Sequence, residues 1–172
     1  MNPCLFENKT KLTDTVLNDW LYFYFNKIQK GKIVKNIVIS IFMIVMGILL
    51  FCFRQEQMDL YFSLLWMILG GILFIYSLVN PTIQKKKQLK NFTSVTFNYE
   101  FYRDSFKIDG KMIHTEILYS RVARVYETEK YFYLYLYNHV VYVLSKKSFK
   151  KKELDSFREL MRENIKVYKD YR

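Results

Sequence analysis

Two long blocks of apolar residues dominate the pattern along the chain. Ile37–Phe53 and Leu60–Val79 contain no charged side chain. At about 1.5 Å of rise per helical residue, the blocks would span roughly 25 Å and 30 Å, close to the hydrocarbon thickness of a bilayer, about 30 Å. Residues 1–36 precede the first block, which is too long a leader for a cleaved signal peptide. The pattern therefore predicts a retained two-helix transmembrane hairpin over residues 37–79. Within it, Gly47, Gly70 and Gly71 allow close approach of the two backbones.

Lysine placement predicts the orientation of this hairpin. Positive residues next to a span favour the cytoplasmic side. They cluster before the first block and after the second, at Lys27, Lys30, Lys32, Lys35, Lys85, Lys86, Lys87 and Lys90. Between the blocks stands Arg54, beside Glu56 and Asp59. We expect a multi-pass protein of the cell membrane with both termini in the cytoplasm.

The N-terminal segment, residues 1–36, carries a helical pattern. Thr13 or Asp14 can cap a helix whose apolar residues recur at helical spacing, namely Leu17, Trp20, Leu21, Tyr24 and Ile28. Two interpretations stay open: the aromatic stripe lies in the membrane interface, or it packs on the polar domain. Residues 5–12 form a candidate short strand before this helix.

From residue 80 the periodicity changes to alternation, which is typical of half-buried strands. Val95, Phe97, Tyr99 and Phe101 face one way, and further strands are predicted from Phe106 to Leu144. Asp109-Gly110 suits a type I′ turn, and Asn138-His139 a second turn. A closing helical stripe contains Leu154, Phe157, Met161, Ile165 and Tyr168. Residues 80–172 are thus expected to form an α+β domain, an antiparallel curved sheet or partial barrel with one C-terminal amphipathic helix.

This order of parts resembles the YcxB-like family of bacterial membrane proteins. The local carriers are VARVYETEKYFYLY from Val122 to Tyr135 and LSKKSFKKKELDSFRELM from Leu144 to Met161. The resemblance implies a two-helix hairpin followed by a C-terminal domain similar to a pleckstrin-homology fold. It implies no catalytic activity, and domains of that shape serve lipid binding, peptide binding and scaffolding.

Candidate catalytic chemistry is sparse. His114 and His139 are the only histidines, and neither has a Cys, His or carboxylate at metal-ligand spacing. We find no glycine-rich phosphate loop, nucleophile elbow or distinctive carboxylate pair. The sequence therefore predicts no enzyme, no cofactor and no metal site.

A row of tyrosines is the most unusual pattern in the polar domain. Tyr131, Tyr133, Tyr135 and Tyr137 alternate with Phe132, Leu134 and Leu136, so the phenols share one face of a strand. They are a candidate face for a protein partner. The plainer interpretation, which the strand propensity of tyrosine favours, is that they cover the outer face of the sheet or pack beneath the N-terminal helix.

Charge favours an anionic membrane surface as a partner. The net charge is +11, and the chain from residue 80 onward holds 20 Lys/Arg against 11 Asp/Glu. Lysines beside a span interact with anionic lipid at about 1 kcal/mol each, so we expect lipid contact rather than nucleic-acid binding. The candidate headgroup contacts are Lys85, Lys86, Lys87, Lys90, Lys146, Lys147, Lys150, Lys151 and Lys152.

Together these features predict a non-enzymatic binding or regulatory module held at the cytoplasmic face of a bacterial membrane. The alternative is a membrane-resident immunity or accessory protein that acts through its hairpin. The sequence names neither the ligand nor the oligomeric state.

Overall fold

The computed structural model describes residues 3–53, 57–90, 95–111, 113–150 and 152–172. The chain forms two compact units. One unit contains Met1–Val16 together with Thr93–Arg172, and the other contains Leu17–Phe92. The apolar helices are therefore inserted within the sequence of the first unit.

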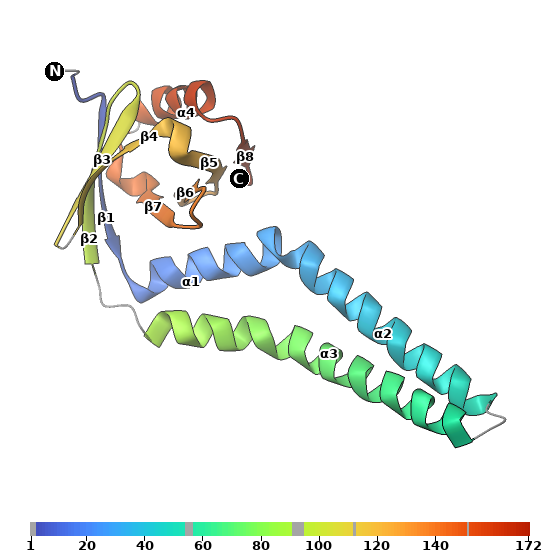
Figure 1. Ribbon diagram of the computed structural model, residues 1–172. Helices are drawn as coiled ribbons and strands as arrows, with labels where there is room; N and C mark the ends of the chain where they lie inside the picture. Colours follow the sequence, from blue (N-terminus) through green and yellow to red (C-terminus); the bar gives the residue numbers. More distant parts are fainter. Residues whose placement is uncertain (1–2, 54–56, 91–94, 112, 151) are drawn as a thin grey trace. The chain divides into compact units, whose positions relative to one another are not determined.

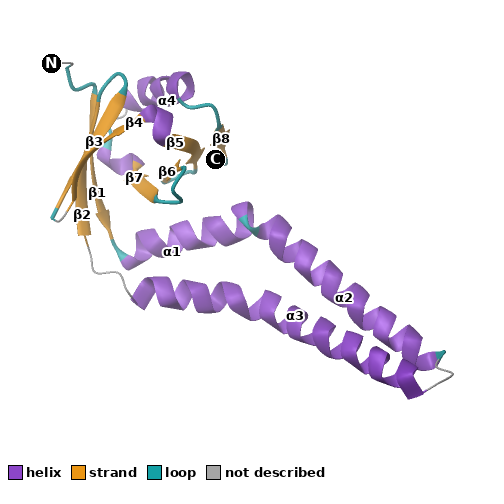
Figure 2. Ribbon diagram, viewed as in Figure 1, coloured by secondary structure: helices purple, strands orange, loops and turns teal. Residues whose placement is uncertain are grey.

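The inserted unit is helical (Figures 1 and 2). Helix α1 (Asp14–Phe23) begins after Thr13, whose hydroxyl accepts a hydrogen bond from Val16 N (3.4 Å). It continues through a π-helical turn (Tyr24–Ile28) into α2 (Lys30–Cys52), and α3 (Gln57–Lys90) runs back. Two helical stretches, Lys30–Cys52 and Gln57–Pro81, are long and apolar enough to cross a membrane, judged by length and composition alone.

Small residues form the seam between α2 and α3. Ser40 and Gly47 on α2 are buried, as are Ser63, Gly70 and Ser77 on α3, and neighbours on each helix are seven residues apart. A Cβ atom on Gly47 would lie 2.6 Å from Met67 Cγ and 2.8 Å from Ser63 O. A Cβ on Gly70 would lie 2.8 Å from Ile44 Cγ1 and 3.0 Å from Ser40 O. Two of the three glycines that we expected to permit close approach do so; Gly71 faces open space.

Two four-stranded sheets make up the other unit, and they do not close into a barrel. The first is antiparallel, in the order β1 (Phe6–Leu12), β2 (Val95–Phe101), β3 (Ser105–Gly110) and β4 (Ile113–Leu118). The second has the order β7-β6-β5-β8, with β5 (Val122–Glu127), β6 (Tyr131–Leu136), β7 (Val141–Ser145) and β8 (Tyr168–Asp170). The expected antiparallel α+β domain is thus present, although β8 is parallel to β5.

Strand β1 connects the two sheets. Residues 6–12, which the sequence assigns to a separate N-terminal segment, pair with β2 from Phe6↔Phe101 to Leu12↔Val95 (Figure 1). On the other side, buried Asn8 donates from Nδ2 to Ser145 O (2.9 Å), and Ser145 N donates to the hydroxyl of buried Thr10 (2.8 Å). Polar side chains therefore link the edge strands β1 and β7.

Aromatic side chains fill the core, with Phe157 at its centre. Helix α4 (Glu153–Asn164) buries Phe157 and Met161, as its helical stripe predicts. The Phe157 ring lies 4.6 to 5.8 Å, centroid to centroid, from four other rings, which come from β1, β2, β6 and the segment before α4: Phe6, Phe101, Phe132 and Phe149.

Three local expectations have different outcomes. The prediction of a type I′ turn at Asp109-Gly110 is wrong. Gly110 pairs with Ile113 inside the β3–β4 ladder and does not have positive φ. Glycine is needed there because a Cβ would lie 2.7 Å from the Phe97 ring. The turn at Asn138-His139 is confirmed, and His139 has a φ of 67°. The closing helix ends at Asn164, before Tyr168, because Ile165 is extended and Val125 N donates to Val167 O (2.8 Å), which starts β8.

Candidate functional site

A fully buried carboxylate, Glu127, lies at the end of strand β5. The three residues Val125, Tyr126 and Glu127 are all buried, because this end of the strand lies between β6 and β8. A buried carboxylate is costly unless charged or hydrogen-bonding groups surround it. Here the surrounding groups come from three other parts of the fold.

Two cations and a phenol contact Glu127 directly. Lys146, from the 3-10 turn that follows β7, donates from Nζ to Oε1. Arg158 of α4 donates from Nε and Nη2 to the same oxygen, at 3.0 and 2.9 Å. The Tyr168 hydroxyl of β8 donates to Oε2. Arg172 approaches with its Nε 3.5 Å from Oε1. The cluster thereby ties β8 to β5, β7 and α4.

Outer carboxylates hold the two arginines in place. Asp155 Oδ1 accepts from Arg158 Nη1 (2.5 Å), and Asp170 accepts from Arg172 Nε at 2.8 and 3.0 Å. The Arg172 hydrogen bonds lower the pKa of Asp170 to about 2. Each guanidinium is therefore fixed in orientation by a carboxylate.

The electrostatics of the cluster favour the ionised carboxylate. Burial alone would raise the pKa of Glu127, but hydrogen bonds from Arg158, Lys146 and Tyr168 outweigh it, so the pKa lies below its ordinary value. Burial and the bond to Glu127 both raise the pKa of Tyr168. Tyr168 therefore stays protonated and acts as a donor near neutral pH.

A surface cavity opens beside the cluster. Its volume is about 590 Å³, and it is lined by Glu129, Lys146, Lys147, Phe149, Leu154, Arg158 and Arg172. Four of these seven residues are cationic, and three of the four cations contact Glu127 or lie near it. The cavity thus combines fixed positive donors with an apolar wall.

Comparison with protein families identifies a similarity within this unit. Residues 101–161 match the family described as YcxB-like protein. The predicted YcxB-like resemblance is therefore confirmed over this part of the chain. The matched residues contain Glu127, Lys146 and Arg158, whereas β1, Tyr168 and Arg172 lie outside them. No curated protein and no solved structure matches the chain.

The structure separates the lysines predicted as headgroup contacts. Among those whose side chains the structure describes, Lys146 and Lys147 line the cavity, and the Lys146 side chain, 10% exposed, is paired with Glu127. Lys150 and Lys152 are exposed, and Lys150 Nζ lies 3.2 Å from Glu153 Oε1. Lys151 lies outside the described residues. The backbone of Lys85, Lys86, Lys87 and Lys90 belongs to α3, but their side chains are not described. Lipid contact by these lysines stays a prediction.

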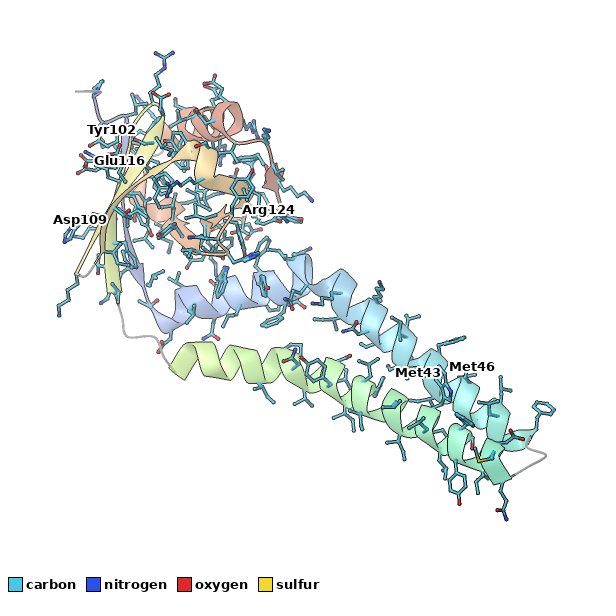
Figure 3. The ribbon with its side chains drawn as sticks, viewed as in Figure 1. Met43, Met46, Tyr102, Asp109, Glu116 and Arg124 are labelled. Carbon is cyan, nitrogen blue, oxygen red and sulfur yellow. The ribbon has the colours of Figure 1, made fainter. Side chains whose placement is uncertain are left out.

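The predicted tyrosine row is graded in exposure. Tyr133 is buried, Tyr131 and Tyr135 are half-buried, and Tyr137, beyond the end of β6, is 66% exposed. Tyr126 of β5 packs edge-on against Tyr135, with ring centroids 5.1 Å apart. Arg124, labelled on β5 in Figure 3, donates from Nη1 to the Tyr126 hydroxyl (3.2 Å). A partner face centred on these tyrosines stays a prediction, with Tyr137 as its exposed member.

The two histidines lie in different sheets, one on an edge strand and the other in a turn. His114 of β4 has its Nδ1 2.5 Å from Oδ1 of Asp109, which Figure 3 labels on β3, and both side chains are exposed. His139 lies in the β6–β7 turn. Among the described residues, no group of three or more His, Cys, Asp or Glu side chains could hold a metal ion.

Sequence reasoning missed the central residues of the cluster. In the sequence, Glu127 looks like the polar end of a strand, and Arg158 looks like part of the polar side of a helix. One signal was present: Glu127 directly follows the apolar pair Val125 and Tyr126 within β5. Nothing in the sequence places Tyr168 or Arg172 beside it, because Tyr168 fits the apolar stripe of the closing helix.

Proposed function

We propose that this chain is a non-enzymatic binding or regulatory module anchored in a bacterial cell membrane, with its sheet domain and both termini in the cytoplasm. The observation that carries the proposal is the insertion of two long apolar helices between the adjacent strands β1 and β2. A hairpin inserted in this way attaches the domain at two points, through the ends of neighbouring strands.

A pleckstrin-homology-like architecture for the domain is part of the proposal. Two sheets that pack around one aromatic core, with α4 covering that core, support it. Two features would be additions to such a domain: strand β8, and strand β1, which comes from the N-terminal side of the helical insertion. Binding rather than catalysis is favoured because the buried carboxylate Glu127 is already hydrogen-bonded to Lys146, Arg158 and Tyr168.

Cysteine labelling tests the orientation, because Cys4 and Cys52 are the only cysteines. In a Cys52→Ser variant, exposed Cys4 should react with a membrane-impermeant maleimide only after the cells are permeabilised. The matched control carries Gln57→Cys in a chain that lacks both natural cysteines. It should react in intact cells. Reaction of Cys4 in intact cells would reject a cytoplasmic N-terminus, and extraction of the protein by alkaline carbonate would reject the anchor.

A second candidate function is action through the hairpin itself. The small-residue seam supports it, because a seam that is packed on one side leaves the outer apolar faces available to lipid or to another membrane protein. A chain without residues 13–94 separates the two functions. Retained activity would exclude the hairpin as the active part.

A further inference from the structure

The cavity beside Glu127 has the features of an anion site. Its four cationic residues come from three separate parts of the chain: Lys146 and Lys147 follow β7, Arg158 lies on α4, and Arg172 is the last residue. Three of them converge because Glu127 lies beneath them. We infer that this cavity binds the phosphate monoester group of an anionic ligand.

The donors are arranged before any ligand arrives. Lys146 and Arg158 are 10% and 14% exposed at their side chains, and each is hydrogen-bonded to Glu127. Cations held in place lose little conformational entropy on binding. A guanidinium has five N–H donors and an ammonium three, and the contacts to Glu127, Asp155 and Asp170 use only part of that capacity.

Local charge decides which anion fits. The lining residues carry four positive charges against the single carboxylate of Glu129. The bracing carboxylates Glu127, Asp155 and Asp170 bring the whole cluster to formal neutrality, so binding must come from short-range hydrogen bonds rather than from long-range attraction. A compact, doubly charged group with several acceptor oxygens uses fixed donors best, and a phosphate monoester is such a group.

Lys147 supplies the remaining donor, and it is the best residue to substitute in a test of binding. It is exposed, and it has no ion-pair partner among the residues that the structure describes. Its ammonium is therefore available to a ligand, and its removal leaves no buried charge uncompensated. The apolar wall of Phe149 and Leu154 adds room for a carbon-containing part of the ligand.

The inference rests on the proposed binding function and gives it a ligand class. The same phosphate chemistry occurs at a lipid headgroup and in free phosphate, and the experiment distinguishes these sources. Binding is measured in neutral detergent, so the result does not depend on membrane location, which carbonate extraction and cysteine labelling test separately.

The experiment is calorimetric titration of the purified full chain. The probes are inorganic phosphate, dihexanoyl phosphatidic acid and, as a control without a monoester, dihexanoyl phosphatidylcholine. The variants are Lys147→Glu and Lys147→Arg. Lys111→Glu, at an exposed position outside the cavity, is the control with the same change of net charge. Circular dichroism confirms that each variant is folded.

We expect saturable binding of one or both phosphate monoesters and none of phosphatidylcholine. Loss of one charge-assisted contact should weaken binding about tenfold or more in Lys147→Glu. Lys147→Arg and Lys111→Glu should stay within about threefold of the natural chain. Tighter binding of phosphatidic acid than of phosphate identifies a lipid headgroup, and equal binding identifies a free anion. Absence of saturable binding, or equal weakening by Lys147→Glu and Lys111→Glu, overturns the inference.

Discussion

Strand β1 makes a sharp prediction about which part of the chain folds by itself. Leu12 pairs with Val95 at the end of the β1–β2 ladder, so the chain on either side of the helical insertion is already adjacent. Replacing residues 13–94 with a short Asn-Gly turn should therefore convert β1 and β2 into an ordinary hairpin. We expect this joined chain to fold as a soluble domain, and a chain of residues 80–172 to fail.

The free energy lost without β1 follows from the contacts that β1 makes. Three hydrogen bonds link it to the segment around β7: Asn8 to Ser145 O, Ser145 N to Thr10, and Ser148 to Lys9 O (2.6 Å). At about 1 kcal/mol each they contribute about 3 kcal/mol. Half-buried Phe6, packed edge-on against Phe157, adds about 1 to 2 kcal/mol. The loss, about 4 to 5 kcal/mol, approaches the whole stability of a small domain, and the exposed β2 edge favours aggregation.

Urea unfolding followed by circular dichroism, together with size-exclusion chromatography, measures both chains. The matched variant is the joined chain with Asn8→Ala and Thr10→Ala, which keeps β1 but removes two of its links. Its free energy of unfolding should fall by about 2 to 3 kcal/mol. A monomeric chain of residues 80–172 with the same unfolding midpoint as the joined chain would refute this account of β1.

Four further predictions test the core, the buried cluster and the helical seam. Phe157→Ala should lower the free energy of unfolding by about 3 to 5 kcal/mol, because its ring is fully buried; a loss below about 1 kcal/mol would place it at the surface. Tyr99→Phe should leave stability unchanged or raise it by up to about 1 kcal/mol in urea unfolding, because the buried Tyr99 hydroxyl has no hydrogen-bond partner among the described residues. Glu127→Gln should cost about 3 to 5 kcal/mol at pH 7 by leaving buried cations unpaired. Since the folded pKa of Glu127 is lowered, its contribution is present above the ordinary value of 4.5 and is lost as the pH falls through the folded pKa; acid titration of stability should lose this component in the variant. Gly47→Ala should destabilise the helical unit in detergent by about 1 to 3 kcal/mol in thermal melts, whereas Gly71→Ala, which meets open space, should be neutral or slightly stabilising; equal effects would contradict the seam.

Local patterns in the sequence determined the elements of this protein. Uncharged blocks of 17 or more residues predicted long helices at α2 and α3, because apolar runs of that length exceed an ordinary strand. Alternation predicted the antiparallel strands but not β8, and helical spacing placed Phe157 and Met161 on the core face of α4. These signals are short-range: each depends on residues within a few turns or one strand.

Only the tertiary structure decided how distant residues meet. Strand β1 pairs with a strand more than eighty residues away, and no local pattern encodes that register. Gly110 is required because the Phe97 ring from the neighbouring strand approaches it, not because a turn needs positive φ. Glu127, Lys146, Arg158 and Arg172 look in the sequence like solvated surface charges. They become a buried cluster because β5, β7, α4 and β8 end at one place, where low polarity makes each ion depend on the others.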